Sequence, residues 1–425
     1  MRRQWQVVRM AGVCAVAVLT AVAVARADSA DQQQLLDRIK QLEAKVNDLE
    51  GKSTQVVTQA SVTGKSLDFL NQVEMSGFVS ASYIYNFSRP TGTSQIAGRG
   101  FDSNNDSFTI NKFKLALEKP VSQDPTNWNA GFRTDLIVGQ DAPITHSSGL
   151  FGGAGSSQDI DLEQAFVDFN IPIGNGLKIT FGKTVTPMGV EVIEEVSNPN
   201  FSEGNQFWYV ENFTQTGVQF AYQWSPKIDT EFYIFNGWDA LPDNNTTKSF
   251  MGRIGIAIND KNSLALVGYG GCEQAADNHD WRTGVNVVYN THCSDKLNLW
   301  VQGDYGHEDN APMLDGGTTA NADWYAAGAW VTYDFTDKVE LALRADYIKD
   351  EDDVRLPVGT TPVTGPNLFS SRPKELYGWT ATLNYKPLAN LQIRPELRWD
   401  RSESPTSFNG KRDQMTAAMG VAYLF

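Results

Sequence analysis

Over the C-terminal four-fifths of its 425 residues, this sequence alternates apolar and polar side chains in segments of about ten residues. In 391–399, Leu391 and Leu397 share one face of an extended chain, and Arg394 and Arg398 share the other. Such period-two alternation predicts β-strands with a different environment on each face. Because an arginine facing lipid at mid-depth costs roughly 2–4 kcal/mol, the charged face must meet water, while the apolar face can meet hydrocarbon.

Sixteen segments of this kind can be counted, and the gaps between them alternate in length. The predicted strands are 73–87, 107–118, 128–140, 161–171, 177–185, 214–224, 228–238, 249–258, 262–270, 280–290, 296–306, 322–333, 338–349, 374–385, 391–401 and 412–425. The short gaps are 172–176, 225–227, 259–261, 291–295, 334–337 and 386–390. The long polar gaps are 88–106, 141–160, 186–213, 307–321 and 350–373. We therefore predict an all-β fold, a transmembrane antiparallel up-and-down β-barrel of about 16 strands, with short turns and both barrel ends in the periplasm of a bacterial outer membrane.

Aromatic side chains gather at the ends of the predicted strands, as the interfacial belts of membrane barrels require. Those near the short turns are Phe169, Tyr222, Trp224, Tyr289, Tyr333, Phe335 and Tyr385. Those near the long loops are Tyr83, Tyr85, Trp238, Trp281, Tyr305, Tyr325, Tyr347, Tyr377 and Trp399. We expect all of them on the lipid-facing side, together with the terminal aromatic Phe425 of the last strand.

The first 72 residues differ from the rest. Residues 1–27 predict a secretory signal peptide, because an arginine-bearing start and an apolar stretch lead to a small-residue cleavage site at Ala27. Residues 28–51 predict a short α-helical coiled coil, although a solvated amphipathic helix fits the same pattern. The residues on heptad a and d positions are Leu35, Ile39, Leu42, Val46 and Leu49. Residues 52–72 have no clear period and indicate a linker.

The charge balance limits the partners that the chain can bind. It carries 35 Lys and Arg against 50 Asp and Glu, a formal net charge of −15. Removing the predicted signal peptide, which holds four arginines and no acids, leaves −19. Nucleic acid is therefore not an expected partner, because phosphate binding needs a basic surface.

Reactive side chains are sparse and scattered. A hydrolase needs serine, histidine and carboxylate together, but every histidine falls in a predicted loop or turn. The histidines are His146, His279, His292 and His307. We predict no catalytic residue, metal or cofactor, and we expect the acidic run 350–353 to be solvated. Cys272 and Cys293 fall at opposite ends of the predicted strand 280–290, about 25 Å apart, which is too far for a disulfide.

Three stretches can be compared with known families. They are Val73–Tyr83 (VEMSGFVSASY), Gly182–Glu191 (GKTVTPMGVE, with Asn198 and Ser202 following) and Thr216–Gln219 (TGVQ). These stretches resemble the OmpL-like β-barrel porins, and the likeness covers about residues 73–425. The sequence departs from that family after Ser202, where Glu203-Gly204 replaces a basic-then-small pair. The layout of a coiled coil before a sixteen-stranded barrel is also similar to trimeric porins, which implies a homotrimer.

The resemblance implies a water-filled pore, and a barrel of this size leaves an aqueous channel. In general porins the third outer loop, here 186–213, folds inward and narrows the pore. Its acids are Glu191, Glu194, Glu195 and Glu203. The bases that face inward by strand parity are Lys112, Lys114, Arg133, Arg253, Arg282, Arg344, Arg394 and Arg398.

Two arrangements of these charges are open. The loop acids could face the bases across the narrowest section and set up a transverse field. Alternatively, the bases pair with acids of the barrel wall. Such wall acids are Asp135, Glu340, Asp346 and Glu396.

On this basis we expect an outer-membrane porin that passes small hydrophilic solutes or ions by passive diffusion, with mild cation selectivity from its acidic loops. The expected partners are outer-membrane lipid, the permeating solutes and further copies of the chain. The alternative is a surface adhesion or structural barrel that uses its long outer loops, several of which are rich in Gly, Ser, Thr and Pro.

Overall fold

The computed structural model describes residues 37–38, 40–47, 71–88, 95–122, 124–151, 158–312, 319–357 and 369–425. The chain divides into two units, Met1–Asn71 and Gln72–Phe425. In the first unit, residues 37–38 and 40–47 are helical, and Leu42 and Val46 are more than half exposed. The predicted association of this helix into a coiled coil therefore stays a prediction. The predicted signal peptide and nearly all of the predicted linker lie outside the described residues.

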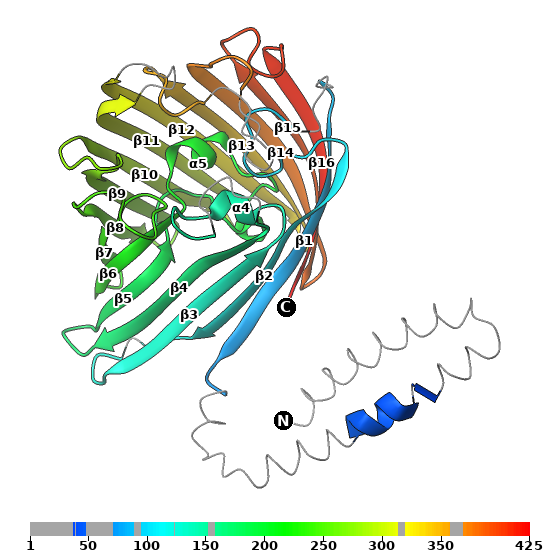
Figure 1. Ribbon diagram of the computed structural model, residues 1–425, viewed down its shortest axis with the longest axis vertical. Helices are drawn as coiled ribbons and strands as arrows, with labels where there is room; N and C mark the ends of the chain where they lie inside the picture. Colours follow the sequence, from blue (N-terminus) through cyan, green and yellow to red (C-terminus); the bar gives the residue numbers. More distant parts are fainter. Residues whose placement is uncertain are drawn as a thin grey trace. The chain divides into compact units, whose positions relative to one another are not determined.

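The described residues of the second unit form a closed antiparallel barrel of sixteen strands (Figure 1). Each strand pairs with its neighbours in sequence, and β1 pairs with β16 to close the sheet. The strands are β1 Glu74–Asn86, β2 Ser107–Lys119, β3 Asn129–Val138, β4 Ile160–Ile171, β5 Leu177–Val185, β6 Thr214–Ser225, β7 Ile228–Phe235, β8 Ser249–Asn259, β9 Asn262–Cys272, β10 Trp281–Ser294, β11 Leu297–Pro312, β12 Thr319–Thr336, β13 Val339–Asp350, β14 Glu375–Leu388, β15 Leu391–Ser402 and β16 Asp413–Leu424. In the described parts of the connections, three short helices lie between strands: α4 Ala142–Thr145, the 3-10 helix η1 Glu195–Ser197, and α5 Asn205–Val210. The predicted number and order of strands are confirmed.

The two ends of the barrel meet at one rim. The backbone groups of Gly77 and Phe425 exchange two hydrogen bonds of 2.9 Å. The same rim carries the short turns, such as 172–176 and 389–390, and we call it the short-turn rim. The opposite rim, the long-loop rim, carries the long connections. No helix among the described residues is both long and apolar enough to cross a membrane.

The two faces of the sheet carry opposite chemistry, as the alternation predicts. On β13 and β15, the side chains of Leu343 and Leu397 are 43% and 49% exposed on the outside of the barrel. Their neighbours Arg344 and Arg398 are 2% and 3% exposed and lie inside. The outer surface also carries stacked aromatic rings, with the centroids of Trp379 and Trp399 4.8 Å apart.

One aromatic of the predicted outer belt does not face lipid. Trp238 follows β7 and packs beside a buried apolar cluster inside the barrel. The guanidinium groups of Arg282 and Arg355 lie 5.0 and 5.5 Å from its ring centroid. Because β7 ends at Phe235, strand parity no longer dictates where Trp238 points, and contact with the two cations holds it inside.

Strands β10, β11 and β12 continue beyond their predicted ends. The ladder between β11 and β12 reaches the pairs Ala311–Ala320 and Pro312–Thr319, within the predicted loop 307–321. Backbone pairing sustains this hairpin where the hydrophobic alternation has stopped, so the sequence pattern does not reveal it. His292 and His307 were predicted in turns and loops, but they lie within β10 and β11.

The predicted separation of the cysteines is confirmed. Cys272 is buried at the long-loop end of β9, opposite Trp281 at the start of β10. Cys293 is exposed near the other end of β10. Both of these thiols are free in the described structure.

The depth of an outward residue should set the cost of charging it. We expect Leu343→Arg, in the middle of β13, to lower the free energy of unfolding by roughly 2–4 kcal/mol, because the guanidinium would face hydrocarbon. The matched control Val339→Arg, at the short-turn end of the same strand, should cost roughly 0–1 kcal/mol. Denaturant unfolding in phospholipid vesicles measures both. Equal losses would contradict this assignment of the lipid-facing band.

Candidate functional site

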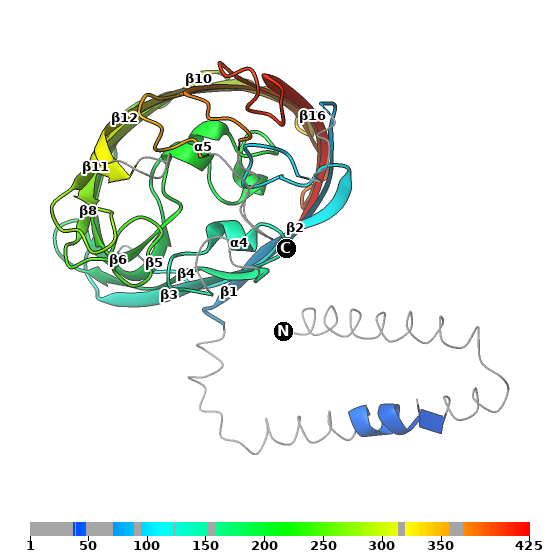
Figure 2. The ribbon, with the colours of Figure 1, turned by 45° about the horizontal axis from the view of Figure 1, so that its top comes forward.

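The segment 186–213 between β5 and β6, which we call the lumen loop, folds into the interior of the barrel. Its helix α5 lies within the ring of strands, as does α4 from the preceding long connection (Figure 2). Much of the loop is buried, and Phe201 and Phe207 are each 2% exposed. The third long connection therefore occupies the space through which a solute would pass.

Wall side chains hydrogen-bond the backbone of the lumen loop, which has no sheet partner there. Val190 N–H donates to the Gln302 amide oxygen on β11 over 2.9 Å. Phe201 and Ser202 N–H donate to one Glu396 carboxylate oxygen on β15, over 2.9 and 3.1 Å. Because a buried backbone N–H needs an acceptor, these wall residues position the loop.

Arg344 on β13 is the centre of the contact between loop and wall. Its guanidinium lies 2.6 Å from Glu191 of the loop and 3.2 Å from Asp346 of the wall, and it donates to the Ser202 carbonyl over 2.5 Å. A side chain at Gly204 would have its Cβ 2.8 Å from Glu191 Oε2 and 3.2 Å from Arg344 Nε. This crowding explains why a residue without a side chain follows Glu203.

Two arginines of β15 bind the loop through its carbonyl groups. Arg394 donates to the carbonyl oxygens of Asn198 and Pro199 over 2.7 and 2.9 Å. Arg398 donates to the Glu203 carbonyl over 2.6 Å and pairs with Asp400 of the wall at 2.8 Å. A guanidinium has five donors in a fixed fork, so one side chain can hold several turns of the loop.

Lys112 on β2 joins two long connections at one point. Its ammonium lies 2.8 Å from Glu195 and 3.8 Å from Glu203 of the lumen loop, and 3.3 Å from Asp141 beside α4. Burial raises the pKa of Asp141 to about 7, despite the ammonium, and raises that of Glu203 well above its usual value. Burial acts the same way on Glu195, but Lys112 outweighs it and holds the Glu195 pKa below its usual value. The raised pKa values favour the uncharged, protonated forms of Asp141 and Glu203, so the ammonium of Lys112 does not have to balance three negative charges.

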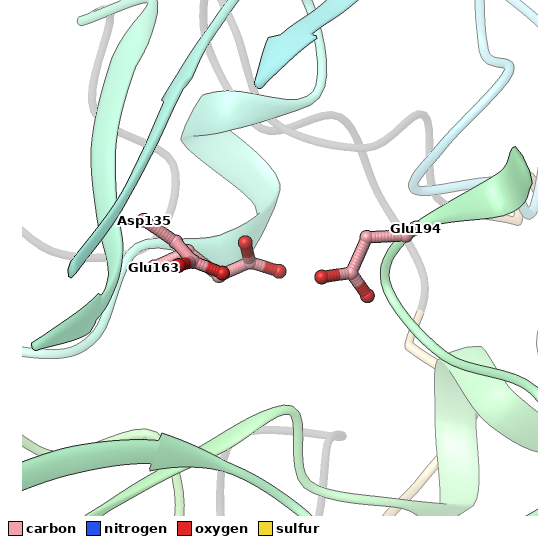
Figure 3. Close-up of side chains that lie close together, drawn as sticks. All are labelled: Asp135, Glu163 and Glu194. Carbon is pink, nitrogen blue, oxygen red and sulfur yellow. The ribbon is translucent and has the colours of Figure 1, made fainter. Parts of the chain in front are cut away.

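Lys114, two residues along β2, lies among three more carboxylates. Asp135, Glu163 and Glu194 point toward one another from β3, β4 and the lumen loop (Figure 3), with ligand oxygens within 4.8 Å of each other. The Lys114 ammonium lies 2.8 Å from Asp135 and 2.6 Å from Glu163, and it also contacts Glu194. This acid triad resembles a cation site whose cation is the lysine. Sequence reasoning missed Glu163, because no local pattern links it to the loop.

All eight predicted bases lie on the inner wall, but they divide into two groups. The bases that contact the lumen loop are Lys112, Lys114, Arg344, Arg394 and Arg398. The bases that pair with wall acids are Arg133, Arg253 and Arg282. The loop acids Glu191, Glu194 and Glu195 thus meet their bases in direct ion pairs rather than across a gap.

Apolar side chains fill much of the lumen near the long-loop rim, which the polar loops do not suggest. In one buried cluster, residues of four connections pack against residues near the long-loop ends of β12, β13 and β14. Its members are Ala97, Tyr209, Val210, Trp324, Ala326, Ile348, Leu356, Phe369, Leu376 and Phe408. The acidic run 350–353 was expected to be solvated, but Asp350 is buried and accepts the N–H groups of Val354 and Leu356.

A closed sixteen-stranded sheet with an apolar exterior, a charged interior and an inward-folded third connection defines a bacterial outer-membrane barrel of the porin class. The chain belongs to the family described as "Putative beta-barrel porin-2, OmpL-like", whose profile matches residues 72–425. The predicted family is confirmed. No curated protein matches the sequence significantly.

Solved structures share the fold at low sequence identity. The outer membrane channel DcaP of Acinetobacter baumannii aligns with a TM-score of 0.54 and 13% identity over 83% of this chain and 97% of its own. The trimer form of OmpT from Vibrio cholerae gives 0.54 and 11% over 83% and 99%. The anion-selective porin from Comamonas acidovorans gives 0.55 and 10% over 83% and 99%. At these identities the likeness concerns the fold alone.

Removing the Lys114 ammonium from the acid triad should destabilise the folded protein. We expect Lys114→Met to lower the free energy of unfolding by roughly 3–5 kcal/mol, because Glu163 and Glu194 lose their buried counter-ion. Since carboxylate oxygens are the ligands that calcium prefers, added Ca²⁺ should restore part of this stability in the variant and not in the natural protein. The control Lys119→Met alters the exposed end of β2. Equal losses in the two variants would show that the triad is not held by Lys114.

The hold on the lumen loop should weaken as pH rises. Asp141 and Glu203 have raised pKa values when enclosed, so the enclosed state binds their protons more tightly than a released state does. Their contribution is complete below their ordinary pKa values and is lost as pH rises through the raised values. Hydrogen exchange of residues 186–213, corrected for intrinsic rates, should accelerate between about pH 4 and about pH 7, the range between the ordinary and the raised pKa of Asp141. Asp141→Asn should reduce this dependence, and an unchanged dependence would exclude Asp141.

Proposed function

We propose that this protein is a porin that passes small hydrophilic solutes or ions by passive diffusion. The proposal rests mainly on the closed barrel, whose inner face is polar and charged while its outer face is apolar. Membership of a porin family supports it. A non-enzymatic role agrees with this family, and we propose none of the four histidines as a catalytic residue.

We propose that the lumen loop forms the constriction, with Glu191, Glu194 and Glu195 as its acids and Arg344, Lys114 and Lys112 as their counterparts. The other five bases of the proposed constriction hold the loop backbone or pair with wall acids: Arg394, Arg398, Arg133, Arg253 and Arg282. Ion pairing through Arg344 and Lys112 holds the loop inside the barrel, so it narrows the route of any solute. Since acids and bases are paired, we propose a weak ionic preference, with mild cation selectivity from the acidic loops.

We propose that the barrel ends lie in the periplasm and that three copies associate through the barrel wall and the N-terminal helix. The common rim of the two barrel ends and the short turns supports this orientation. The trimer form recorded for OmpT of Vibrio cholerae, which shares the fold, supports the oligomer. The exposed apolar side chains of Leu42 and Val46 are available for helix association.

Planar-bilayer recording of the purified protein tests the pore. We expect stepwise ion conductance, with a slight preference for cations. The double variant Glu191→Gln with Glu195→Gln should shift selectivity toward anions, because Arg344 and Lys112 lose their loop partners. Unchanged selectivity would remove the loop from the mechanism. A barrel that inserts but does not conduct would favour the adhesion or structural alternative.

A further inference from the structure

A polar alcove lies between the lumen loop and the inner wall of β11 to β15. Its volume is about 220 Å³, and residues Val196–Pro199 of the loop line one side of it. It sits near the short-turn rim, because Glu340 and Gln392 are the second residues of β13 and β15. At roughly 30 Å³ per water molecule, this volume is enough for a small organic solute and too small for a peptide.

Two side chains of opposite charge, Glu340 and Lys386, line the alcove, and each has unused hydrogen-bonding capacity. Glu340 Oε1 accepts a hydrogen bond from the Asn384 amide over 2.7 Å, and its second oxygen has no partner among the described residues. The Lys386 side chain is exposed near the end of β14, and its ammonium has no acid or acceptor in the described part of the chain. The two groups are not paired with each other, although they come from adjacent strands. An unpaired carboxylate and an unpaired ammonium in one cavity are complementary to a solute that carries both charges.

The rest of the lining supports such a solute without competing for it. Arg394 also lines the alcove and its charge attracts Glu340, but its donors are engaged: its Nε donates to Asn384 over 2.7 Å, and its Nη2 donates to the carbonyls of Asn198 and Pro199. It therefore fixes the loop side of the alcove. The indole of Trp300 supplies an apolar surface against which a short aliphatic group can pack.

We propose that this alcove is a binding subsite for small zwitterions of the amino-acid class. The solute's ammonium group contacts Glu340, its carboxylate contacts Lys386, and its side chain packs on Trp300. The proposal rests on the porin function proposed above and deepens it, because a weak subsite at the exit of the constriction favours the solutes that it binds.

Saturation-transfer NMR on the detergent-solubilised full chain tests the subsite without requiring conduction. The probes are alanine, lactate and alaninol, which have the same three-carbon skeleton with both charges, the carboxylate alone and the ammonium alone. We expect alanine to bind with a dissociation constant about tenfold lower than either analogue, because each lacks one charge-assisted contact.

Substitutions of Glu340 and Lys386 test which charge of the solute each side chain contacts. Glu340→Gln keeps an acceptor for Asn384 and should weaken alanine about tenfold while leaving lactate unchanged. Lys386→Gln should weaken alanine and lactate and leave alaninol unchanged. The control Lys261→Gln removes an exposed turn lysine outside the alcove and should change nothing.

Equal binding of the three probes, or alanine binding that survives both substitutions, would overturn the subsite. Absence of conductance in the bilayer, with selective alanine binding intact, would instead count against the porin function and leave the subsite standing. The two proposals can therefore fail separately.

Discussion

Closure of the sheet is the constraint on which this structure depends. Inside a bilayer, each backbone N–H and C=O that lacks a partner costs several kcal/mol, so a sheet can cross only if it has no edge. Strand β1 pairs with β16 along their length, from Phe78–Leu424 to Asn86–Thr416. That pairing turns sixteen strands into a ring and gives the chain a protected interior.

Charged side chains inside the closed barrel need partners that charged side chains on an open surface do not need. On an open surface, Arg344 and Lys112 would be solvated and would contribute little through ion pairs. Inside the barrel they are buried, and each must find counter-charges and acceptors or pay a large desolvation cost. The lumen loop supplies Glu191 to Arg344 and Glu195 to Lys112, so the charges of the wall select the conformation of the loop.

The two ends of the lumen are lined by side chains of different character. Toward the long-loop rim, apolar side chains from several connections pack together, and Tyr209 and Phe369 stack with ring centroids 5.8 Å apart. Toward the short-turn rim, Glu340 and Lys386 line an open alcove. Apolar packing and an open polar cavity thus lie in different parts of one loop-filled barrel.

The sequence by itself determined the barrel, because the period-two pattern of a strand indicates which of its side chains face lipid and which face the lumen. Leu343 beside Arg344 is sufficient to assign a lipid face and a lumen face, and most of the other strands show the same alternation, although the pattern is weaker in 177–185 and 262–270. Strand number, strand order and the inner position of all eight bases follow from this local information. The family also follows, since its motifs lie on these strands and on the lumen loop.

Only the tertiary structure decided how the interior is filled. Glu163 joins Lys114 and Glu194, and Trp238 turns inward to two arginines, through contacts between residues far apart in the chain. Loops carry no periodic pattern, so their composition does not show that Phe369 and Leu356 are buried. Glu340 and Lys386 lie on strands, but strand facing does not show that they share a cavity that the lumen loop completes. The physical reason is that strand facing is a property of neighbouring residues, whereas lumen contacts arise only after the ring has closed.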